Sequence, residues 1–389
     1  MNIGFFSDVY RPGIDGIVTA LDMFLIESKK LGHNTYIVTP RYPGYSDENT
    51  PQAGQVIRVP SIPFLFYPPY RIGLPGLSKK TYLRLESLKL EIIHTHSPFS
   101  VGLYGVHLAR KWNLPLLYTY HTLYPKYVHY FFKGKIISSE GAAKIVRNYS
   151  DKCDCVIAPS PQMRDELISY GVKTRVVVLP TGVNKDDFTA RDLFSVRQKH
   201  NLGTSTKILL YAGRLGKEKN LYLLLGAFRK VLKEMPDTVL FLAGDGILKD
   251  ELKSISKSRG IADKTIFLNF LDRQTLAQYY KEADLFVFPS VTETQGLVLI
   301  EVMMNKTAVL TMNQGGVLSI VRHNENGILS DNSEDEFAGW IIKILKDDAL
   351  RKRLEEAGYR SALEMTSEIS TKKHIELYRD LLSSPKYKK

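Results

Sequence analysis

The sequence is short of cysteine and of long apolar runs. Its 389 residues include two cysteines, Cys153 and Cys155, too few for a disulfide framework. No apolar run approaches the roughly 18–20 residues that cross a bilayer as a helix. The N-terminus MNIGFFSDVY lacks the basic region and the apolar region of a signal peptide. These absences predict a cytoplasmic protein without a transmembrane helix.

Acidic residues are scarce in one part of the chain. Residues 51–150 hold 13 Lys and Arg against 3 Asp and Glu, an excess of +10, whereas the rest carries only +2 of the net charge of +12. We therefore expect an anionic partner for the N-terminal half, which is a membrane, a nucleic acid or an acidic substrate.

Two nucleotide-binding fingerprints are absent. The sequence contains neither GxGxxG nor GxxxxGK[ST], and so has no standard dinucleotide motif and no P-loop. The first apolar segment is nevertheless followed by SDVYRPGIDGI, in which Gly13 and Gly16 precede a helical pattern. Glycines at that place let backbone amides approach an anion at a helix N-terminus. A plain tight turn is the alternative.

Apolar runs of strand length alternate with helical patterns along the chain. Such alternation predicts an α/β protein with two doubly wound, mostly parallel sheets. We expect one domain over residues 1–185, a second over 186–369, and a C-terminal helix within 370–389 that packs back on the first domain. In the first domain the predicted strands are Asn2–Ser7, Asn34–Thr39, Val56–Pro60, Ile92–His94, Leu116–Tyr120, Cys155–Ala158 and Val176–Leu179. In the second they lie in KILLYAG, TVLFLAG, TIFLNF, LFVFPS and TAVLTM.

Polar residues follow several of these strands, at the ends where open α/β sheets bind ligands. Arg214 and Lys219 come after KILLYAG. Arg forks bidentately onto phosphate oxygens and Lys supplies a point charge, so the pair suits a phosphate group. A solvated charge run is the alternative for GKEK. Asp245, in AGDG after the next strand, is a candidate to fix its loop or to contact a ligand.

Histidines gather in the first half, in IIHTHSP and TYHTLY. His94 and His96 point to the same side of a strand, as a metal-binding pair would. No carboxylate or cysteine lies at ligand spacing nearby, so we expect no metal site. One of the two should be a core histidine and the other should lie at the strand end. His121 directly follows an apolar strand and should face a ligand cleft.

Two glutamates, Glu293 and Glu301, occur in VTETQGLVLIEVM, around the start of a helical pattern. In a continuous helix they would lie about 12 Å apart. The carboxylate pairs of glycosidases lie only ~5–5.5 Å or ~6.5–9.5 Å apart. The two are thus better placed to hold two ends of an extended ligand than to hydrolyse one bond. We expect Thr292 or Thr294 to cap the helix, with the amides of residues 294–297 facing an anion.

These motifs together resemble the retaining nucleotide-sugar glycosyltransferases of family 4, which have the GT-B fold. The resemblance rests on E-x7-E after a strand, GR…K upstream of it, PTGVN near the domain junction, HTHSP and TYHT, and it spans nearly the whole chain. It implies two Rossmann-like domains facing a cleft, the second of which grips a nucleotide sugar. No DxD follows a strand, which fits transfer without a metal or a bound cofactor, with cations and helix dipoles stabilising the leaving diphosphate.

The resemblance also implies roles for single residues. Glu301 would bind the ribose hydroxyls of a UDP-sugar, and Glu293 the hydroxyls of the sugar. His121 would lie against the transferring sugar and the acceptor, so His121 and Glu293 are the catalytic candidates. Arg214 and Lys219 would clamp the diphosphate. Further donor contacts are expected from Gly16, Asp245, Thr294, Gln295, Gly296 and Leu297.

Within this family, TETQGL and YHTLYPKYVHYF are most similar to the bacterial diacylglycerol glucosyltransferases, which make alpha-monoglucosyldiacylglycerol from UDP-glucose. That likeness implies transfer of glucose to the 3-hydroxyl of 1,2-diacylglycerol. Segments 64–90 and 124–147 mix aromatic and basic residues, and each basic residue near an anionic membrane contributes ~1 kcal/mol. We therefore expect a monotopic enzyme on the cytoplasmic side of the membrane. The predicted acceptor and membrane contacts are His96, Lys79, Lys80, Arg84, Tyr124, Lys126 and Tyr127.

Other interpretations stay open at this point. Both basic segments are alternatively ordinary helices with solvated basic faces. In the same fold, a transferase of glucose, galactose or mannose that extends a glycolipid or a cell-surface polysaccharide is an alternative, as is a non-catalytic sensor of sugar nucleotides. In a different class, a nucleic-acid-binding protein would use the basic half, although no recognisable nucleic-acid motif is present.

Overall fold

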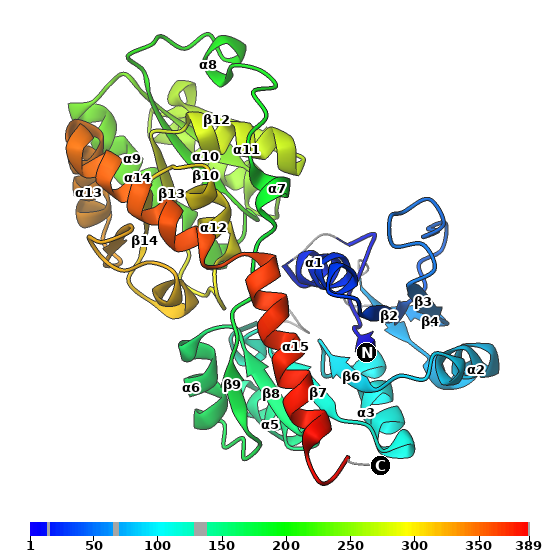
Figure 1. Cartoon of the computed structure of the whole chain (residues 1–389). Coiled ribbons are helices and arrows are strands. Elements are labelled where there is room, and N and C mark those ends of the chain that lie inside the picture. Colours follow the sequence, from blue (N-terminus) through cyan, green and yellow to red (C-terminus); the bar gives the residue numbers. More distant parts are fainter. Residues whose placement is uncertain (14–15, 65–69, 128–137, 388–389) are drawn as a thin grey trace. The chain divides into compact units, whose positions relative to one another are not determined.

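The computed structural model describes residues 1–13, 16–64, 70–127 and 138–387 (Figure 1). The chain divides into two compact units. Unit 1 comprises Met1–Gly182 and Ser367–Lys389, and unit 2 comprises Val183–Thr366. The domain junctions expected from the sequence lie three residues further along the chain in both cases.

Unit 1 is built on a seven-stranded parallel sheet of order β3-β2-β1-β6-β7-β8-β9. All seven predicted strands are present, each within one residue of the expected bounds, because continuous apolar runs are typical of strands buried on both faces. A short antiparallel hairpin, β4–β5, lies outside this sheet. The strands are β1 (Asn2–Phe6), β2 (Asn34–Pro40), β3 (Val56–Val59), β4 (Ser61–Pro63), β5 (Arg71–Gly73), β6 (Ile92–Thr95), β7 (Leu116–Thr119), β8 (Cys155–Ala158) and β9 (Val176–Val178).

Helices cover both faces of this sheet. Successive side chains of a strand point to opposite faces, so Phe5 belongs to one core and Phe6 to the other. The core of Phe5 is closed by α1 (Gly16–Lys30) and α15 (Ser367–Ser383), which is red in Figure 1. The core of Phe6 is closed by the longer helices α2 (Lys79–Ser87), α3 (Ser100–Trp112), α5 (Ser139–Ser150) and α6 (Pro161–Ser169), and by Tyr124 of the short α4 (Tyr124–Tyr127).

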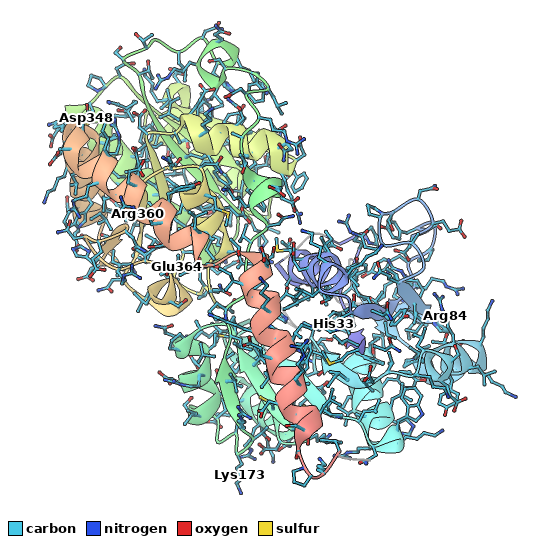
Figure 2. All side chains as sticks on the ribbon, viewed as in Figure 1. His33, Arg84, Lys173, Asp348, Arg360 and Glu364 are labelled. Carbon is cyan, nitrogen blue, oxygen red and sulfur yellow. The ribbon has the colours of Figure 1, made fainter. Side chains whose placement is uncertain are left out.

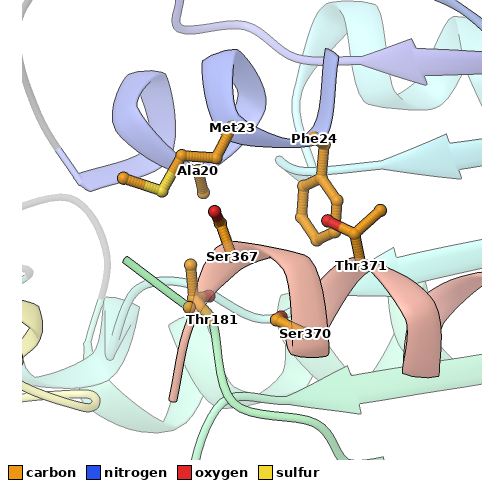
Figure 3. A pocket seen from close by; sticks show the side chains of 8 residues that line it. Ala20, Met23, Phe24, Thr181, Ser367, Ser370 and Thr371 are labelled. Atoms are coloured by element: carbon orange, nitrogen blue, oxygen red, sulfur yellow. The ribbon is translucent and has the colours of Figure 1, made fainter. Parts of the chain in front are cut away.

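A small cavity lies between α1 and α15, within unit 1 (Figure 3). Its volume is about 10 Å³, which is room for one water molecule. Thr371 Oγ1 is buried and has no hydrogen-bond partner among the described residues, so a single water there would satisfy it. The lining residues are Ala20, Met23, Phe24, Thr181, Gly182, Ser367, Ser370 and Thr371.

Unit 2 contains a six-stranded parallel sheet of order β12-β11-β10-β13-β14-β15. The five predicted strands are present, and the short β15 was not predicted. The strands are β10 (Lys207–Ala212), β11 (Thr238–Ala243), β12 (Thr265–Asn269), β13 (Leu285–Phe288), β14 (Val309–Met312) and β15 (Ile328–Ser330). The longer helices are α9 (Leu221–Glu234), α10 (Lys249–Ser258), α11 (Arg273–Glu282), α12 (Leu297–Met304), α13 (Glu334–Lys346) and α14 (Asp348–Leu363).

The path of the chain through this second sheet fixes where a ligand can bind. From β10 the chain moves outward to β11 and β12, and then returns to β13 on the other side of β10. The carboxyl ends of β10 and β13 therefore flank a topological switch point, the place where open α/β sheets bind ligands.

None of the helices in the described part of the chain combines the length and the apolar character that a membrane crossing requires.

Candidate functional site

The switch point of unit 2 brings together residues that are 74 positions apart in the sequence. Lys219 ends the short helical turn after β10, and Glu293 lies in the loop after β13; their side chains form an ion pair. Only 13% of the lysine and 14% of the glutamate side chain is exposed. Ser290 Oγ donates a further hydrogen bond of 2.7 Å to the same oxygen, Glu293 Oε1. The carboxylate is thus held from both loops at once.

These contacts also decide the charge of Glu293. Burial alone raises its pKa, but the charge of Lys219 and the hydrogen bonds from Lys219 and Ser290 outweigh burial, and the pKa ends below its ordinary value. Glu293 is therefore a carboxylate at neutral pH. It can accept hydrogen bonds from hydroxyl groups, whereas it has no proton to donate.

Arg214 lies at the exposed side of the loop after β10. Its Nη2 is 3.1 Å from Oε1 of Glu218, and the arginine side chain is 59% exposed whereas the glutamate is 4% exposed. Glu218, which sequence reasoning missed, thus anchors a guanidinium group that stays accessible. Gly216 leaves room for this anchor, because a Cβ there would stand 2.6 Å from the Glu218 carboxylate. The segment GKEK is therefore no solvated charge run.

Glu301 lies in the second turn of α12, whereas Glu293 precedes that helix, so the interval between them is not one helix. The hydroxyl of Tyr280 donates to Glu301 Oε2 at 3.1 Å. Burial raises the pKa of Glu301 to about 7, and the hydrogen bond from Tyr280 and the charge of Arg273 offset only part of that rise. A ligand whose hydroxyl groups donate hydrogen bonds to this carboxylate would favour its ionised form.

The expected side-chain cap of α12 is wrong. Its N-cap is Gly296, with φ 92°, and no side chain caps the helix, so neither Thr292 nor Thr294 has that role. Glycine adopts this left-handed conformation without the strain of a Cβ. The facing backbone comes close, because a Cβ on Gly316 would clash with the carbonyl of Thr294, and the Gly316 amide donates to Glu293 O at 2.8 Å. Backbone contacts therefore shape this loop.

The other predicted donor contacts of unit 2 differ in exposure. Gln295 is buried in the loop, and Leu297 is the first residue of α12. Asp245 follows β11 and is exposed; it accepts from the Gly246 amide at 2.8 Å and from Lys249 Nζ at 3.3 Å, and both contacts lower its pKa.

Gly16, the predicted contact of the first loop, is the first residue of α1 in unit 1. No described atom lies within 4 Å of the place where its Cβ would stand, so packing does not require a glycine there. Residues 14 and 15 of the same loop lie outside the described residues.

A second group of predicted residues lies in unit 1, beyond β6 and β7. His96 Nδ1 and His121 Nε2 are 2.8 Å apart, and the two rings stack with centroids 5.1 Å apart. His96 was predicted among the acceptor and membrane contacts, but it is fully buried and contacts His121 instead. His94 is the expected core histidine, with Nδ1 2.7 Å from the Tyr378 hydroxyl and Nε2 2.7 Å from Thr119 Oγ1.

The surroundings favour one placement of the proton between His96 and His121. His96 Nε2 is buried without a hydrogen-bond partner in the described part of the chain. An unpaired buried N–H is less common than an unpaired acceptor, so we assign the His96 proton to Nδ1, from which it donates to His121 Nε2. His121 then carries its own proton on Nδ1. Burial, helped by the charge of His374, lowers the pKa of His121 to about 3, so its ring is a neutral hydrogen-bond donor.

The predicted basic contacts of unit 1 fall into two groups. Lys79, Lys80 and Arg84 are exposed on α2 (Arg84 is labelled in Figure 2), whose inner face buries Thr81 and Leu85. This helix therefore presents a basic face to solvent.

The second group, Tyr124, Lys126 and Tyr127, belongs to the short α4, and two of its side chains contact other residues of unit 1. Lys126 pairs with Glu166 at 2.8 Å. Tyr124 packs against the core of the Phe6 face, and its ring meets that of Phe99 edge-on. The side chain of Tyr127 and residues 128–137 lie outside the described residues.

The raised pKa of Glu301 predicts a stabilising substitution. The pKa of this carboxyl group is about 7 in the folded state and ~4.3 in the unfolded state. The group therefore lowers the free energy of unfolding progressively as pH rises between these values. We expect Glu301→Gln to raise the free energy of unfolding of unit 2 by up to about 3 kcal/mol at pH 8, and by close to nothing at pH 4.5. Urea unfolding followed by tryptophan fluorescence in a Trp112→Phe background, which leaves only Trp340 in unit 2, measures this. The exposed Glu325→Gln is the control, and equal behaviour of the two variants would contradict the prediction.

Known proteins are similar to this chain along its whole length. Residues 14–187 match the family model described as Glycosyltransferase Family 4, and residues 194–361 match that of Glycosyl transferases group 1. An alpha-monoglucosyldiacylglycerol synthase of Streptococcus pneumoniae is 34% identical, over 100% of this chain and 88% of the relative. The enzyme of the same name from Acholeplasma laidlawii is 28% identical, over 98% of each chain.

Solved structures share the fold. Sucrose-phosphate synthase from Thermosynechococcus elongatus superimposes with a TM-score of 0.82 at 24% identity, over 98% of this chain and 99% of that one. Anabaena HepE in complex with UDP and glucose superimposes with a TM-score of 0.79 at 18% identity, over 98% and 100%. With its two doubly wound units, its paired loops at the switch point and these full-length similarities, the chain belongs to glycosyltransferase family 4, and it is a glycosyltransferase with the GT-B fold.

Proposed function

We propose that this protein transfers glucose from UDP-glucose to the 3-hydroxyl of 1,2-diacylglycerol at the surface of an anionic membrane, with retention of the anomeric configuration. The observation that carries the proposal is the similarity over the full chain to two alpha-monoglucosyldiacylglycerol synthases, including the acceptor half. The excess of +10 in residues 51–150 and the exposed basic face of α2 support the membrane surface as the place of reaction.

The site in unit 2 has the groups that a nucleotide sugar needs. Glu293, as a carboxylate, accepts hydrogen bonds from hydroxyl groups of the sugar, and Glu301 accepts them from the ribose. An ammonium group has three N–H donors, so Lys219 can stay paired with Glu293 and still bind a phosphate oxygen. Arg214, anchored by Glu218, adds a second cation. The HepE structure with UDP and glucose supports a donor of this kind.

The proposed reaction needs no protein nucleophile. The bond between the anomeric carbon and the diphosphate oxygen breaks, and the acceptor oxygen forms its new bond on the same face of the sugar. The acceptor hydroxyl proton passes to the leaving diphosphate oxygen, whose growing charge Arg214 and Lys219 stabilise. His121, as a neutral donor, holds a hydroxyl of the transferring sugar.

Mixed micelles containing diacylglycerol test the proposal directly. We expect UDP-glucose to give alpha-glucosyldiacylglycerol, identified by mass spectrometry and NMR, with higher rates when an anionic lipid is present and no loss on addition of EDTA. UDP-galactose and GDP-mannose serve as donor controls. Salt-dependent binding to liposomes but not to oligonucleotides excludes the nucleic-acid alternative, and a lack of transfer to every glycerolipid offered would refute the proposal.

Substitution of Glu293 tests its role on the sugar. Glu293→Gln keeps the shape but removes the carboxylate, and we expect kcat to fall by at least about 100-fold, because interactions at the reacting sugar act in the transition state. The Kd for UDP should change little, since Arg214 and Lys219 remain and the diphosphate itself supplies a counterion for Lys219. Glu325→Gln, on the surface of unit 2, is the control. Unchanged turnover of Glu293→Gln would overturn the assignment.

His96 should act as a positioning residue for His121. The amide of Asn can replace Nδ1–H as the donor to His121, whereas Leu cannot. We therefore expect His96→Leu to lower kcat by about ten- to 100-fold with an unchanged KM for UDP-glucose, and His96→Asn to restore most of the rate. Imidazole ¹⁵N shifts of His121 report its tautomer in each variant. Equal rates in the Leu and Asn variants would mean that the hydrogen bond has no such role.

A further inference from the structure

A basic pocket lies at the carboxyl edge of the sheet in unit 1. Arg41 directly follows β2 and Pro60 directly follows β3, and these two strands are neighbours. Ser61 and Arg71 come from the hairpin β4–β5 beside them. Together with Pro43 these residues line a cavity of about 220 Å³. Arg71 belongs to the basic segment 64–90, whereas Arg41, Pro43, Pro60 and Ser61 lie outside both basic segments.

Arg71 is held in a fixed position with part of its guanidinium group available. Its Nε donates to Ser61 Oγ at 2.8 Å, and its Nη2 donates to Ser61 O at 3.0 Å. The group also lies over the ring of Tyr42, 5.9 Å from the centroid. Because arginine has five N–H donors, three remain for a ligand.

Arg41 has no such internal partner. Its side chain is exposed and forms no hydrogen bond or ion pair with the described residues. The nearby Arg58 gives the contrast, since its Nε and Nη2 each lie 2.8 Å from an oxygen of Asp47 and both side chains are mostly buried. Asp47 is thus used by Arg58, and none of the residues that line the pocket carries a carboxylate.

Two guanidinium groups in one pocket without a carboxylate repel each other, and a bound anion removes that repulsion. The planar fork of arginine matches two oxygens of a phosphoryl group. The pocket is smaller than the roughly 300–1,000 Å³ of sites for drug-sized ligands. It therefore suits a small anionic headgroup rather than a whole lipid.

The opposite face of the hairpin indicates where such a headgroup comes from. Ile62 and Ile72 are paired across the two strands and are 48% and 37% exposed. Side chains alternate along a strand, so this apolar pair faces away from Ser61 and Arg71. Exposed apolar side chains beside basic ones match the interface of a membrane.

We propose that Arg41 and Arg71 bind the phosphoryl group of an anionic lipid, separately from the acceptor lipid that receives the sugar. The inference rests on the proposed reaction at a membrane and adds to it a defined headgroup site. Such a site would hold unit 1 on membranes that contain anionic lipid.

Binding measurements test this site without requiring turnover. The probes are vesicles of phosphatidylcholine with and without phosphatidylglycerol, and soluble sn-glycerol 3-phosphate. The test variant is Arg41→Gln, which breaks no internal hydrogen bond and so leaves folding intact. The control is Lys173→Gln, an equal charge loss at an exposed residue of unit 1 (labelled in Figure 2).

We expect Arg41→Gln to weaken binding to vesicles with phosphatidylglycerol by at least about ten-fold, as hydrogen bonds to charged groups are lost. Lys173→Gln should weaken it by about five-fold or less, the effect of one surface charge. Binding to pure phosphatidylcholine should be equal for all. If Arg41→Gln and Lys173→Gln behave alike, only net charge acts and the site does not exist.

Two further outcomes separate this inference from neighbouring ones. If Arg41→Gln loses binding of sn-glycerol 3-phosphate but not of vesicles, the ligand is a soluble phosphate ester and the lipid assignment is wrong. If no variant or wild type transfers glucose to a glycerolipid, yet Arg41→Gln alone loses the anionic vesicles, the proposed reaction fails and the headgroup site stands.

Discussion

The buried ion pair between Lys219 and Glu293 is the interaction on which the candidate site depends. It joins the loops that follow β10 and β13, the neighbouring strands between which the order of the sheet in unit 2 reverses. Two buried charges stabilise each other only while both are present, because either one alone would be an uncompensated charge away from water. The pair therefore fixes the distance between the two loops and keeps Glu293 ionised before any ligand arrives.

The same chain segment contains a second glutamate with the opposite electrostatic character. Glu293 has a cation and a hydroxyl as partners, and its pKa is lowered, whereas Glu301 has the phenol of Tyr280 and a raised pKa of about 7. Groups whose surroundings shift their pKa values apart are suited to different tasks. One is a permanent acceptor, and the other exchanges its proton near neutral pH, so its affinity for a hydroxyl-rich ligand should depend on pH.

The sequence was sufficient for features that depend on neighbouring residues, and insufficient for those that depend on distant ones. Buried parallel strands are continuous apolar runs, so twelve strands were found, whereas the antiparallel pair β4 and β5 and the short β15 were not. The cap of α12 was misplaced because Gly316, far along the chain, decides the path of the loop at Thr294. The anchor of Arg214 by Glu218, and the contact of His96 with His121, likewise arise only when the loops are brought together.

The basic character of the N-terminal half illustrates the same limit, because a count of charges cannot distinguish structural cations from binding ones. The structure makes that distinction through internal counterions. Arg58 donates to both oxygens of Asp47, and Lys126 is paired with Glu166, so these cations contribute to the fold of unit 1. Arg41 has no carboxylate among the described residues, and Arg71 is oriented by a serine rather than by an acid. A cation that folding leaves without an anion retains its full attraction for one outside the chain, and for that reason the pocket of Arg41, more than the total charge, indicates where an anionic partner binds.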